Sequence, residues 1–550
     1  MKSLEKYIRA HALKNAIEFN KTDAGRILPK LFQHGLEKSK IKEIMPELQK
    51  IIKEINSLSQ SEKQAEFKKF AELVPEHEEK PHELAELKNT KKVIMRFEPS
   101  PSGPLHVGHA YVLGLNSEYV KKYNGKLILR IGDTNPENIY PQAYNLIQEN
   151  AEWLTNNVSE VIIQSDRLPI YYKYFEKLID LEKAYVCVCD TEEYKNLLSK
   201  SEACPCRSLS VKEQKERWKL MFTKYAPGEA VARIKTNLKD KNPAMRDFPV
   251  FRINETKHAR QGKKYRVWPL MNMSVLVDDI ESNVTHIIRA KDHADNAKRQ
   301  EIIYKYLNKQ PPQNLFVGRI NFLGMPLSTT ETRKLIESKK YSGWDDIRLP
   351  FLPALKKRGF LPESLIKYAL DIGVTLTDKT VSKEEFFKTI ESHNRKLLDP
   401  TANRYSFVKN PVEIKVKNPP KISEVKVPIH PDKNLTRAVQ VSNNLFISSD
   451  DFAKFAGKEI RLLHLYNIQL KKDKTAEFTS LENKDIPKIN WVSSQNIKCK
   501  ILLPDGNYDN GIAEQSIKTL KKDEVLQFER YAFVKLDKRG EVYEFWYTHK

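Results

Sequence analysis

Apolar residues recur every three or four positions along the first 75 residues of the chain. One such series runs through Ile41, Ile44, Leu48, Ile51 and Ile52. This spacing places apolar side chains along one face of a helix, and the segment shows little of the alternation expected of strands. A charged, proline-punctuated stretch over residues 75–81 follows and is typical of a linker. The pattern predicts an N-terminal helical domain, with its linker, over residues 1–85.

Short apolar runs alternate with helical periodicity from about residue 86 to residue 340. The runs predicted as strands are 93–97, 126–131, 161–163, 275–279 and 284–293. A helix is predicted between two of these strands, over residues 142–154. Strands that alternate with helices favour a parallel sheet with crossover helices. The sequence therefore predicts an α/β domain over 86–340, interrupted by an insertion at about 185–265.

The pattern of apolar and polar residues changes twice in the C-terminal part of the chain. Helical periodicity covers 341–405, and short β-rich runs separated by turn residues follow after Pro411. These runs are residues 446–448, 460–465, 490–492 and 531–536. Many short strands with turns between them indicate one or two β-barrels over 406–550.

Length and charge narrow the choice of partner. The 550 residues exceed what one core accommodates, so several domains are expected. The chain carries 94 basic and 72 acidic residues, a formal net charge of +22, which favours a polyanion such as a nucleic acid. No run of about eighteen uncharged apolar residues is present, and the N-terminus lacks an apolar signal core. We expect no membrane span and a cytoplasmic protein.

Four of the five cysteines form two closely spaced pairs. They are Cys187, Cys189, Cys204 and Cys206, two Cys-x-Cys pairs. In a reducing compartment, paired thiolates at such spacing favour a tetrahedral zinc site over a disulfide pair. Four protein ligands leave no open position, so the predicted Zn²⁺ is structural. The alternative is a reduced cluster without metal.

The segment 96–109 carries the strongest chemical signal, because it leads from a predicted strand through a proline-rich turn into a helix. A helix N-terminus offers unpaired N–H groups and a positive dipole end, which suit phosphate. Gly108 allows a close approach to the backbone, and His106 and His109 can donate hydrogen bonds to phosphoryl oxygens. The segment resembles the HIGH motif of class I aminoacyl-tRNA synthetases, which activate amino acids with ATP. The alternative is a capped helix with surface histidines.

Further segments extend this resemblance along nearly the whole chain. They are residues 129–136, 284–293, a polar loop over 324–335, 343–350, 394–408 and 527–530. In this order they resemble glutamyl-tRNA synthetases of the archaeal and eukaryotic, non-bacterial type. The resemblance implies an α/β Rossmann-like class I catalytic core with a zinc-binding insertion and an N-terminal helical domain. It also implies a helical stem-contact region over 341–405 and β-barrel anticodon-binding domains over 406–550.

The same resemblance implies ATP, with Mg²⁺, as a substrate. The residues that would bind ATP are His106, Gly108, His109, Leu327, Ser328 and Lys334. The residues that would be catalytic are His106, His109, Arg333 and Lys334. The histidines would stabilise charge on the α-phosphate and the two cations would hold the leaving pyrophosphate, so no protein nucleophile is required. Glu331 stands where the family frequently has lysine.

The resemblance also implies a set of glutamate-binding residues. They are Arg96, Ser100, Asp133, Met271 and Arg289. Arg289 matches the arginine that pairs with the side-chain carboxylate of the substrate, whereas the neutral amide of glutamine would leave that buried charge unpaired. Gly132 stands where the family commonly has an acid, so Asp133 is left as the acid for the substrate ammonium. Met271 stands where a tyrosine is frequent.

The expected function is the ligation of L-glutamate to tRNA(Glu) through a glutamyl-adenylate. tRNA(Gln) is a further candidate partner. The alternatives are a glutaminyl-tRNA synthetase, which Arg289 disfavours, and a catalytically weakened tRNA-binding or scaffold relative. The N-terminal domain carries no chemical motif, and we interpret it as a docking module for other proteins.

Overall fold

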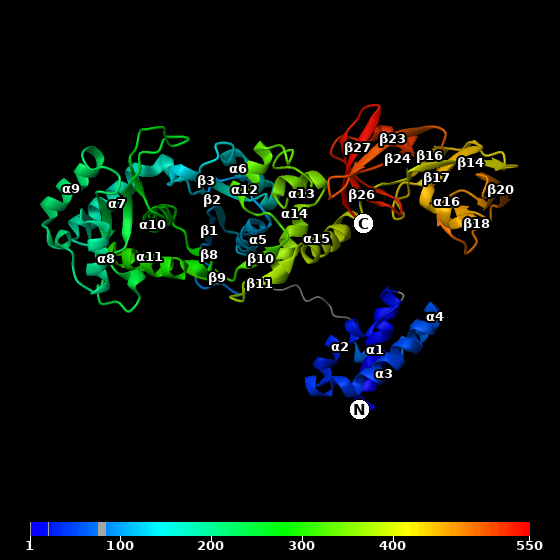
Figure 1. Cartoon of the computed structure of the whole chain (residues 1–550), viewed down its shortest axis with the longest axis horizontal. Coiled ribbons are helices and arrows are strands. Elements are labelled where there is room, and N and C mark those ends of the chain that lie inside the picture. Colours follow the sequence, from blue (N-terminus) through cyan, green and yellow to red (C-terminus); the bar gives the residue numbers. More distant parts are fainter. Residues whose placement is uncertain (1, 20, 75–83) are drawn as a thin grey trace. The chain divides into compact units, whose positions relative to one another are not determined.

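The computed structural model describes residues 2–19, 21–74 and 84–550. The chain forms two compact units: unit 1 within Met1–Glu83 and unit 2 over Leu84–Lys550 (Figure 1). The predicted linker at 75–81 lies outside the described residues. Among the described helices, none is long and apolar enough to cross a bilayer.

The described part of unit 1 consists of helices joined by short turns, without strands. Its α-helices are α1 (Lys2–Phe19), α2 (Ala24–Leu31), α3 (Ile41–Ser57) and α4 (Gln60–Phe67). The predicted stripe on α3 points inward, because Ile44, Leu48 and Ile51 are buried. They pack with Leu13 of α1 and Leu31 of α2 in one core. The predicted helical character of this region is confirmed.

A five-stranded parallel sheet forms the centre of the first half of unit 2. Its strands are β1 (Ile94–Phe97), β2 (Lys126–Ile131), β3 (Val158–Ile163), β8 (His286–Ala290) and β9 (Gln313–Val317). They lie in the order β3-β2-β1-β8-β9, with all neighbours parallel. Helices α5 (Val107–Lys122) and α6 (Ala143–Thr155) connect β1 to β2 and β2 to β3. The predicted Rossmann-like core is confirmed, and the strand order changes direction between β1 and β8.

A second, antiparallel sheet lies in the sequence between β3 and β8, in the region of the predicted insertion. It consists of β4 (Ala184–Cys187), β5 (Val231–Ile234), β6 (Pro249–Ile253) and β7 (Val267–Pro269). Helices α7 (Leu168–Asp180), α8 (Thr191–Ser199) and α9 (Val211–Thr223) belong to the same region. Phe175, Trp218, Phe251 and Trp268 form the centre of its separate core.

The prediction of a strand at 275–279 is wrong. These residues lie within helix α10 (Met271–Glu281), which is buried from Asn272 to Asp279. A helix that is buried on all sides has no polar face, so its apolar run shows no helical period and resembles a buried strand. The correction matters because α10 delivers Met271 and Asp279 to the edge of the parallel sheet. Helix α11 (Ala294–Tyr306) then follows β8.

The segment 320–398 has mixed structure. It contains β10 (Ile320–Leu323), α12 (Thr329–Glu337), α13 (Leu352–Arg358), α14 (Pro362–Ile372), β11 (Lys379–Ser382) and α15 (Lys383–Leu398). Its helix α14 packs against α5 and α6 of the parallel-sheet region. The polar loop predicted over 324–335 is therefore a loop only as far as Ser328. Ser328 caps α12 by accepting a hydrogen bond from the backbone N–H of Glu331, and serine is a favoured residue at this position.

The C-terminal region consists mainly of two seven-stranded sheets. The first contains β12 (Arg404–Tyr405), β13 (Phe407–Lys409), β23 (Asn496–Leu502), β24 (Tyr508–Glu514), β25 (Val525–Phe528), β26 (Ala532–Lys538) and β27 (Val542–His549). The second contains β14 (Pro411–Lys417), β17 (Asn444–Ser448), β18 (Glu459–Leu462), β19 (Asn467–Leu470), β20 (Thr475–Ser480), β21 (Lys488–Ile489) and β22 (Val492–Ser493). A hairpin of β15 (Glu424–Pro428) and β16 (Thr436–Gln440) and the short helix α16 (Ser449–Phe455) complete the region. The chain enters the first sheet, builds the second and returns to the first, and each sheet has its own core.

Arg358 joins the helical segment to the first of these sheets. Its buried guanidinium donates a hydrogen bond of 3.0 Å to the carbonyl of Thr548, and the hydroxyl of Thr548 donates back to the carbonyl of Arg358. Burial lowers the pKa of Arg358 to about 10, so it stays charged at neutral pH. These two hydrogen bonds fix α13 against β27.

The turn between α5 and β2 provides a stability test of the parallel sheet. A Cβ atom on Gly125 would lie 2.3 Å from the carbonyl oxygen of Val93, which the N–H of Lys126 must reach. We expect Gly125→Ala to lower the free energy of unfolding by about 3 kcal/mol, since the backbone must shift. Thermal unfolding of the purified protein measures the effect. Gly540→Ala is the control, because its added Cβ meets nothing closer than 3.7 Å; equal melting of the two variants would contradict the account.

Candidate active site

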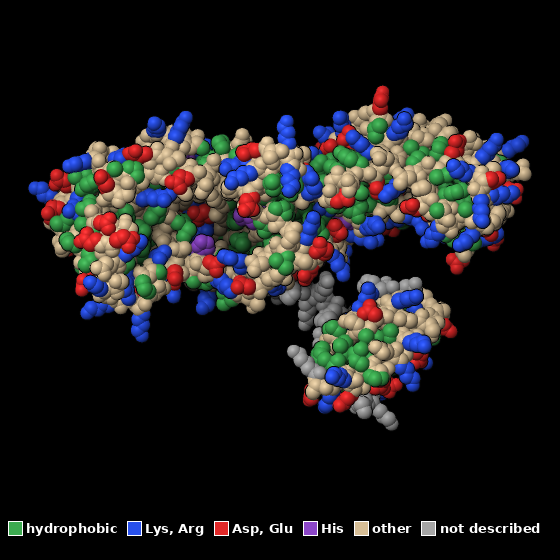
Figure 2. Space-filling model, viewed as in Figure 1, with side chains coloured by type: hydrophobic (Ala, Val, Ile, Leu, Met, Phe, Trp, Pro, Cys, Tyr) green, Lys and Arg blue, Asp and Glu red, His purple; other side chains and the backbone are tan. Residues whose placement is uncertain are grey.

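A cavity of about 390 Å³ opens at the carboxyl ends of β1, β2 and β8. Open α/β sheets bind ligands at the carboxyl ends of the strands where the strand order reverses, which here is at the neighbouring strands β1 and β8. Of the residues predicted to bind glutamate, Arg96, Ser100, Met271 and Arg289 line the cavity. Figure 2 shows a hollow on one face of unit 2 where histidine side chains are exposed.

A network of buried charges lies behind one wall of this cavity, and two of its members, Arg96 and Glu98, line the cavity itself. The guanidinium of Arg130 donates to Oδ1 of Asp279 at 2.8 Å and to Oε2 of Glu98 at 2.7 Å. Arg96 lies 3.3 Å from the same oxygen of Asp279 and 3.5 Å from the same oxygen of Glu98. Burial opposes the charge on Arg130, but the two carboxylates outweigh it and raise its pKa. The same arginines outweigh burial at Asp279 and lower its pKa.

Arg289 faces the cavity without a carboxylate partner. Its side chain donates one hydrogen bond, of 3.0 Å, to the amide oxygen of Gln300, and its buried Nε has no acceptor. No ion pair involves Arg289 within the described ranges of unit 2. Burial, with the nearby charge of Arg96, lowers its pKa to about 10, so the group remains a cation at neutral pH. A buried cation with unused donors requires an anion.

The cavity therefore has a defined charge balance. The guanidinium groups of Arg96, Arg130 and Arg289 outnumber the carboxylates of Glu98 and Asp279 by one. The pKa of His293, which also lines the cavity, is lowered by burial, so this ring is neutral. A ligand with one net negative charge complements this wall.

Asp133 does not line the cavity. Its carboxylate accepts hydrogen bonds from the hydroxyl of Tyr144 at 2.7 Å and the backbone N–H of Ser165 at 2.8 Å. The buried ring of His258, from the inserted region, lies 3.6 Å from the same carboxylate and 2.9 Å from the Asp133 carbonyl. These partners use both carboxylate oxygens, so Asp133 ties the insertion to the sheet and is not available to a substrate.

The two histidines lie at the start of α5, as predicted. Nδ1 of His106 accepts from the N–H of Gly108 at 3.1 Å, and Nδ1 of His109 accepts from the N–H of His106 at 3.3 Å. Their rings stack with centroids 3.8 Å apart. Burial lowers the pKa of His109 to about 4 and that of His106 well below its usual value.

These contacts determine the tautomer of both rings. A neutral imidazole whose Nδ1 accepts must carry its proton on Nε2. Neither Nε2 atom has a protein partner in the part of the chain that the structure describes, so both present free donors. A Cβ on Gly108 would lie 3.0 Å from the ring of His106 and would displace it.

The predicted phosphate clamp lies on the helix that follows the short loop. Leu327 and Ser328 end the loop, and Arg333 and Lys334 project from α12. The guanidinium of Arg333 lies 5.8 Å from the centre of the Tyr140 ring, and Lys334 is exposed. The hydroxyl of Thr329 donates to that of Ser102 at 2.9 Å and holds the start of α12 against the turn before His106. In the described residues, no hydrogen bond or ion pair joins these two cations to the histidines.

Glu98 and Gln300 are the site residues that sequence reasoning missed. Glu98 stands inside the 96–109 segment, directly after β1, which is the signal that could have identified it. Gln300 lies in α11, and only the fold brings it to Arg289.

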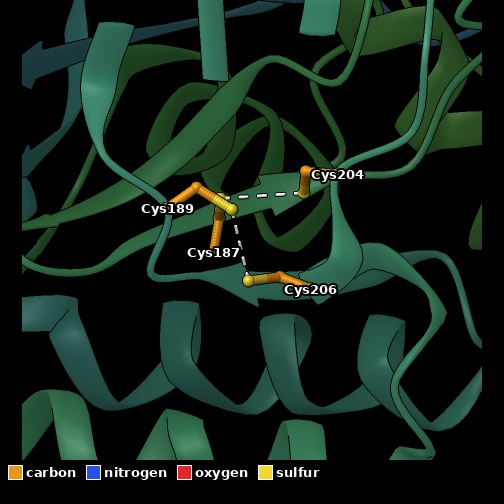
Figure 3. A group of neighbouring side chains, drawn as sticks. All are labelled: Cys187, Cys189, Cys204 and Cys206. Atoms are coloured by element: carbon orange, nitrogen blue, oxygen red, sulfur yellow. Dashed lines mark hydrogen bonds between the residues drawn. The ribbon is translucent and has the colours of Figure 1, made fainter. Parts of the chain in front are cut away.

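The four clustered cysteines converge in the inserted region. Figure 3 shows their side chains pointing toward one another. Cys187 ends β4 and Cys189 follows it, whereas Cys204 and Cys206 lie at the start of the short helix Pro205–Ser208. Their sulfurs all lie within 4.8 Å, with 3.8 Å between Cys187 and Cys204 and 3.6 Å between Cys189 and Cys206. Tetrahedral zinc–thiolate bonds of about 2.3 Å place sulfurs about 3.8 Å apart. The cluster therefore fits a four-coordinate Zn²⁺, and all four thiols are free of disulfides.

Removal of one cysteine tests the metal site. We expect the wild-type protein to carry about one zinc per chain and Cys204→Ser to lose it, with a lower unfolding temperature. Elemental analysis and thermal unfolding measure the two effects. Cys499→Ala, at a buried thiol far along the sequence, is the control that should keep its zinc. A Cys204→Ser variant with a full complement of zinc would contradict the assignment.

Comparisons with known proteins agree along the chain. The family model "tRNA synthetases class I (E and Q), catalytic domain" matches residues 92–400. Two models of the anticodon-binding domain of the same family match residues 402–484 and 488–537. The "Glutamate--tRNA ligase" of Methanocaldococcus jannaschii is 39% identical over 554 residues, which cover 98% of each chain. That of Pyrococcus abyssi is 40% identical over 580 residues, which cover 100% of each chain.

Proposed function

Because the chain belongs to the class I tRNA synthetases for glutamate and glutamine, we propose that it joins L-glutamate to tRNA(Glu). In the first step the α-carboxylate of glutamate attacks the α-phosphate of ATP, which forms glutamyl-adenylate and releases pyrophosphate. In the second step a hydroxyl at the 3′ end of the tRNA takes the glutamyl group and releases AMP. The observation that carries the choice of glutamate is the unpaired guanidinium of Arg289 in the cavity.

Glutamate fits the charge of this cavity and glutamine does not. Glutamate has two carboxylates and one ammonium, so it brings the single negative charge that the wall lacks. Glutamine is neutral overall, and its amide would leave Arg289 buried without a counter-charge. Sites built around such a group discriminate by several kcal/mol. No observation favours a glutamine enzyme or a scaffold without activity.

ATP would bind along the start of α5. The free Nε2–H groups of His106 and His109, with the N-terminus of α5, would donate to phosphoryl oxygens and stabilise the charge that develops there. Ser328 and the cations Arg333 and Lys334 would hold the leaving pyrophosphate, and Mg²⁺ would help to neutralise the charge of the phosphates when bound. This assignment is supported by the donor geometry at the histidines and by the packing of α12 on the same turn.

tRNA would contact the C-terminal sheets and the helical segment before them. The formal net charge of +22 supports binding of the phosphate backbone. Three further statements stay predictions: that tRNA(Gln) is also a partner, that the protein works in the cytoplasm, and that unit 1 docks other proteins.

The function is tested by charging of purified tRNA(Glu) and tRNA(Gln) with ATP and labelled glutamate, in parallel with labelled glutamine. We expect glutamate on tRNA(Glu) and no glutamine on either tRNA. Glutamate on tRNA(Gln) would add the second tRNA to its substrates. Glutamine as the amino acid used, or no charging by a protein that binds tRNA, would contradict the proposal.

Arg289→Ala tests the recognition of glutamate. Loss of a charge-assisted bond to the substrate costs about 3 kcal/mol, so we expect KM for glutamate to rise roughly 100-fold while KM for ATP stays within about 2-fold. Steady-state charging measures both constants. Lys291→Ala is the matched control, since Lys291 follows the same strand but pairs with Asp378 at the surface. Unchanged use of glutamate by Arg289→Ala would refute the assignment.

A pair of substitutions at His109 separates its two ring nitrogens. Asparagine can replace Nδ1 as an acceptor but lacks a donor at the position of Nε2, whereas glutamine places an amide N–H there. We expect His109→Asn to lower kcat about 100-fold and His109→Gln to retain more activity. Pre-steady-state formation of the adenylate, with tRNA present, checks this order. Equal loss in both variants would show that the Nε2–H donor is not what matters.

A further inference from the structure

The cavity contains one carboxylate oxygen that no protein group uses. Oε2 of Glu98 accepts from Arg130 and lies near Arg96, but Oε1 has no hydrogen-bond partner among the described residues. Glu98 lines the cavity and its side chain is 14% exposed. The free oxygen therefore faces the space that a ligand would occupy.

Gly132 keeps the space in front of this oxygen open. A Cβ atom at position 132 would lie 3.5 Å from Oε1 of Glu98 and 3.6 Å from the amide oxygen of Gln164. Both oxygens are acceptors, and both residues line the cavity together with Gly132. A small cationic group at this point would have a negative oxygen and a neutral oxygen within reach.

Other acids are excluded from this role by their positions. Asp133 uses both carboxylate oxygens inside the protein, and Asp279 is buried behind Arg96 and Arg130. Of the described residues that line the cavity, Glu98 is the one acid. A ligand's ammonium placed beside Arg96 or Arg289 would be repelled, and the other polar residues that line the cavity offer no negative charge.

We propose that Oε1 of Glu98 binds the α-ammonium of the substrate amino acid. This inference rests on the proposed function, in which the same cavity holds glutamate with its side-chain carboxylate on Arg289. Glu98 and Arg289 then fix opposite charges of one substrate, and the hydrogen bond from Arg130 holds Glu98 in position. Arg130 thus orients the carboxylate of Glu98, and Arg289 attracts the side-chain carboxylate of the substrate.

Glutarate separates this role from a merely structural one, because it has both carboxylates of glutamate but no ammonium. Glu98→Gln keeps the shape of the side chain and removes its charge. We expect this variant to bind glutamate roughly 10- to 100-fold more weakly but glutarate at least as tightly as the wild type does, because the loss of the Glu98 charge leaves the arginines for the two carboxylates of glutarate. Calorimetric titration of the full-length protein with each compound gives the two dissociation constants. Glu160→Gln, an exposed position on β3, is the control.

Two results would overturn the inference. If Glu98→Gln weakens glutamate and glutarate equally, Glu98 acts only by holding the arginines. If neither affinity changes, Glu98 does not contact the ligand. A second variant tests position: Glu98→Ala combined with Gly132→Asp is expected to regain at least about 10-fold of the lost glutamate affinity, since the new carboxylate would enter the same space. A double variant as weak as Glu98→Ala alone would contradict the assigned place of the ammonium.

These binding constants are independent of tRNA charging. A wild-type protein that charges no tRNA, but whose Glu98→Gln variant loses glutamate selectively, would refute the proposed function and support the role of Glu98. Normal tRNA charging by the wild-type protein, together with unchanged glutamate affinity in Glu98→Gln, would support the proposed function and refute the role of Glu98.

Discussion

The guanidinium of Arg130 lies fully buried between the carboxylates of Asp279 and Glu98, and the rest of the site depends on this arrangement. The three groups come from β2, α10 and the residue after β1, so the ion pairs fix three parts of the chain at one edge of the sheet. Buried ion pairs contribute little net stability, because desolvation offsets their attraction. Their effect here is positional: they hold Arg96 and Glu98 toward the cavity and leave Arg289 as the unmatched cation.

This charge balance would select and orient the amino acid through non-covalent contacts alone. No side chain of the protein then needs to react with the substrate. Binding of the side-chain carboxylate and the ammonium at opposite ends would leave the α-carboxylate free to attack ATP. The rate would then come from positioning and from donors at the start of α5, which neutral histidines provide without a proton transfer. Asp133 contributes indirectly, since its contacts with Tyr144 and His258 fix the inserted sheet beside the cavity.

The local periodicities were sufficient to predict four strands of the parallel sheet, β1, β2, β3 and β8, as well as the helical character of unit 1 and the insertion. They did not predict β9. They failed at α10, where burial of every face removes the polar stripe by which a helix is recognised. They also failed for α12, whose polar residues resemble a loop until its serine cap is considered. The path of the chain through the two C-terminal sheets depends on pairings between residues about a hundred positions apart, such as Phe407 with Ala513 and Arg404 with Gln527, which no local pattern encodes.

For the site, residue types and their spacing singled out the histidines and the cysteines, and the family resemblance singled out Arg289. It could not distinguish Asp133 from Glu98, because both are acids that follow buried strands of the same sheet. Only the structure shows that one is enclosed by donors and the other has a free oxygen in the cavity. The hydrogen bond of Arg289 to Gln300, and not to an acid, likewise follows only from the tertiary structure.

A crystal structure of the protein with bound L-glutamate tests the central claim most directly. The account predicts the side-chain carboxylate within about 3 Å of the Arg289 guanidinium and the ammonium within about 3 Å of Oε1 of Glu98, normal distances for charged hydrogen bonds. Glutamate bound in the reverse orientation, with its ammonium away from Glu98, or bound outside this cavity, would contradict it.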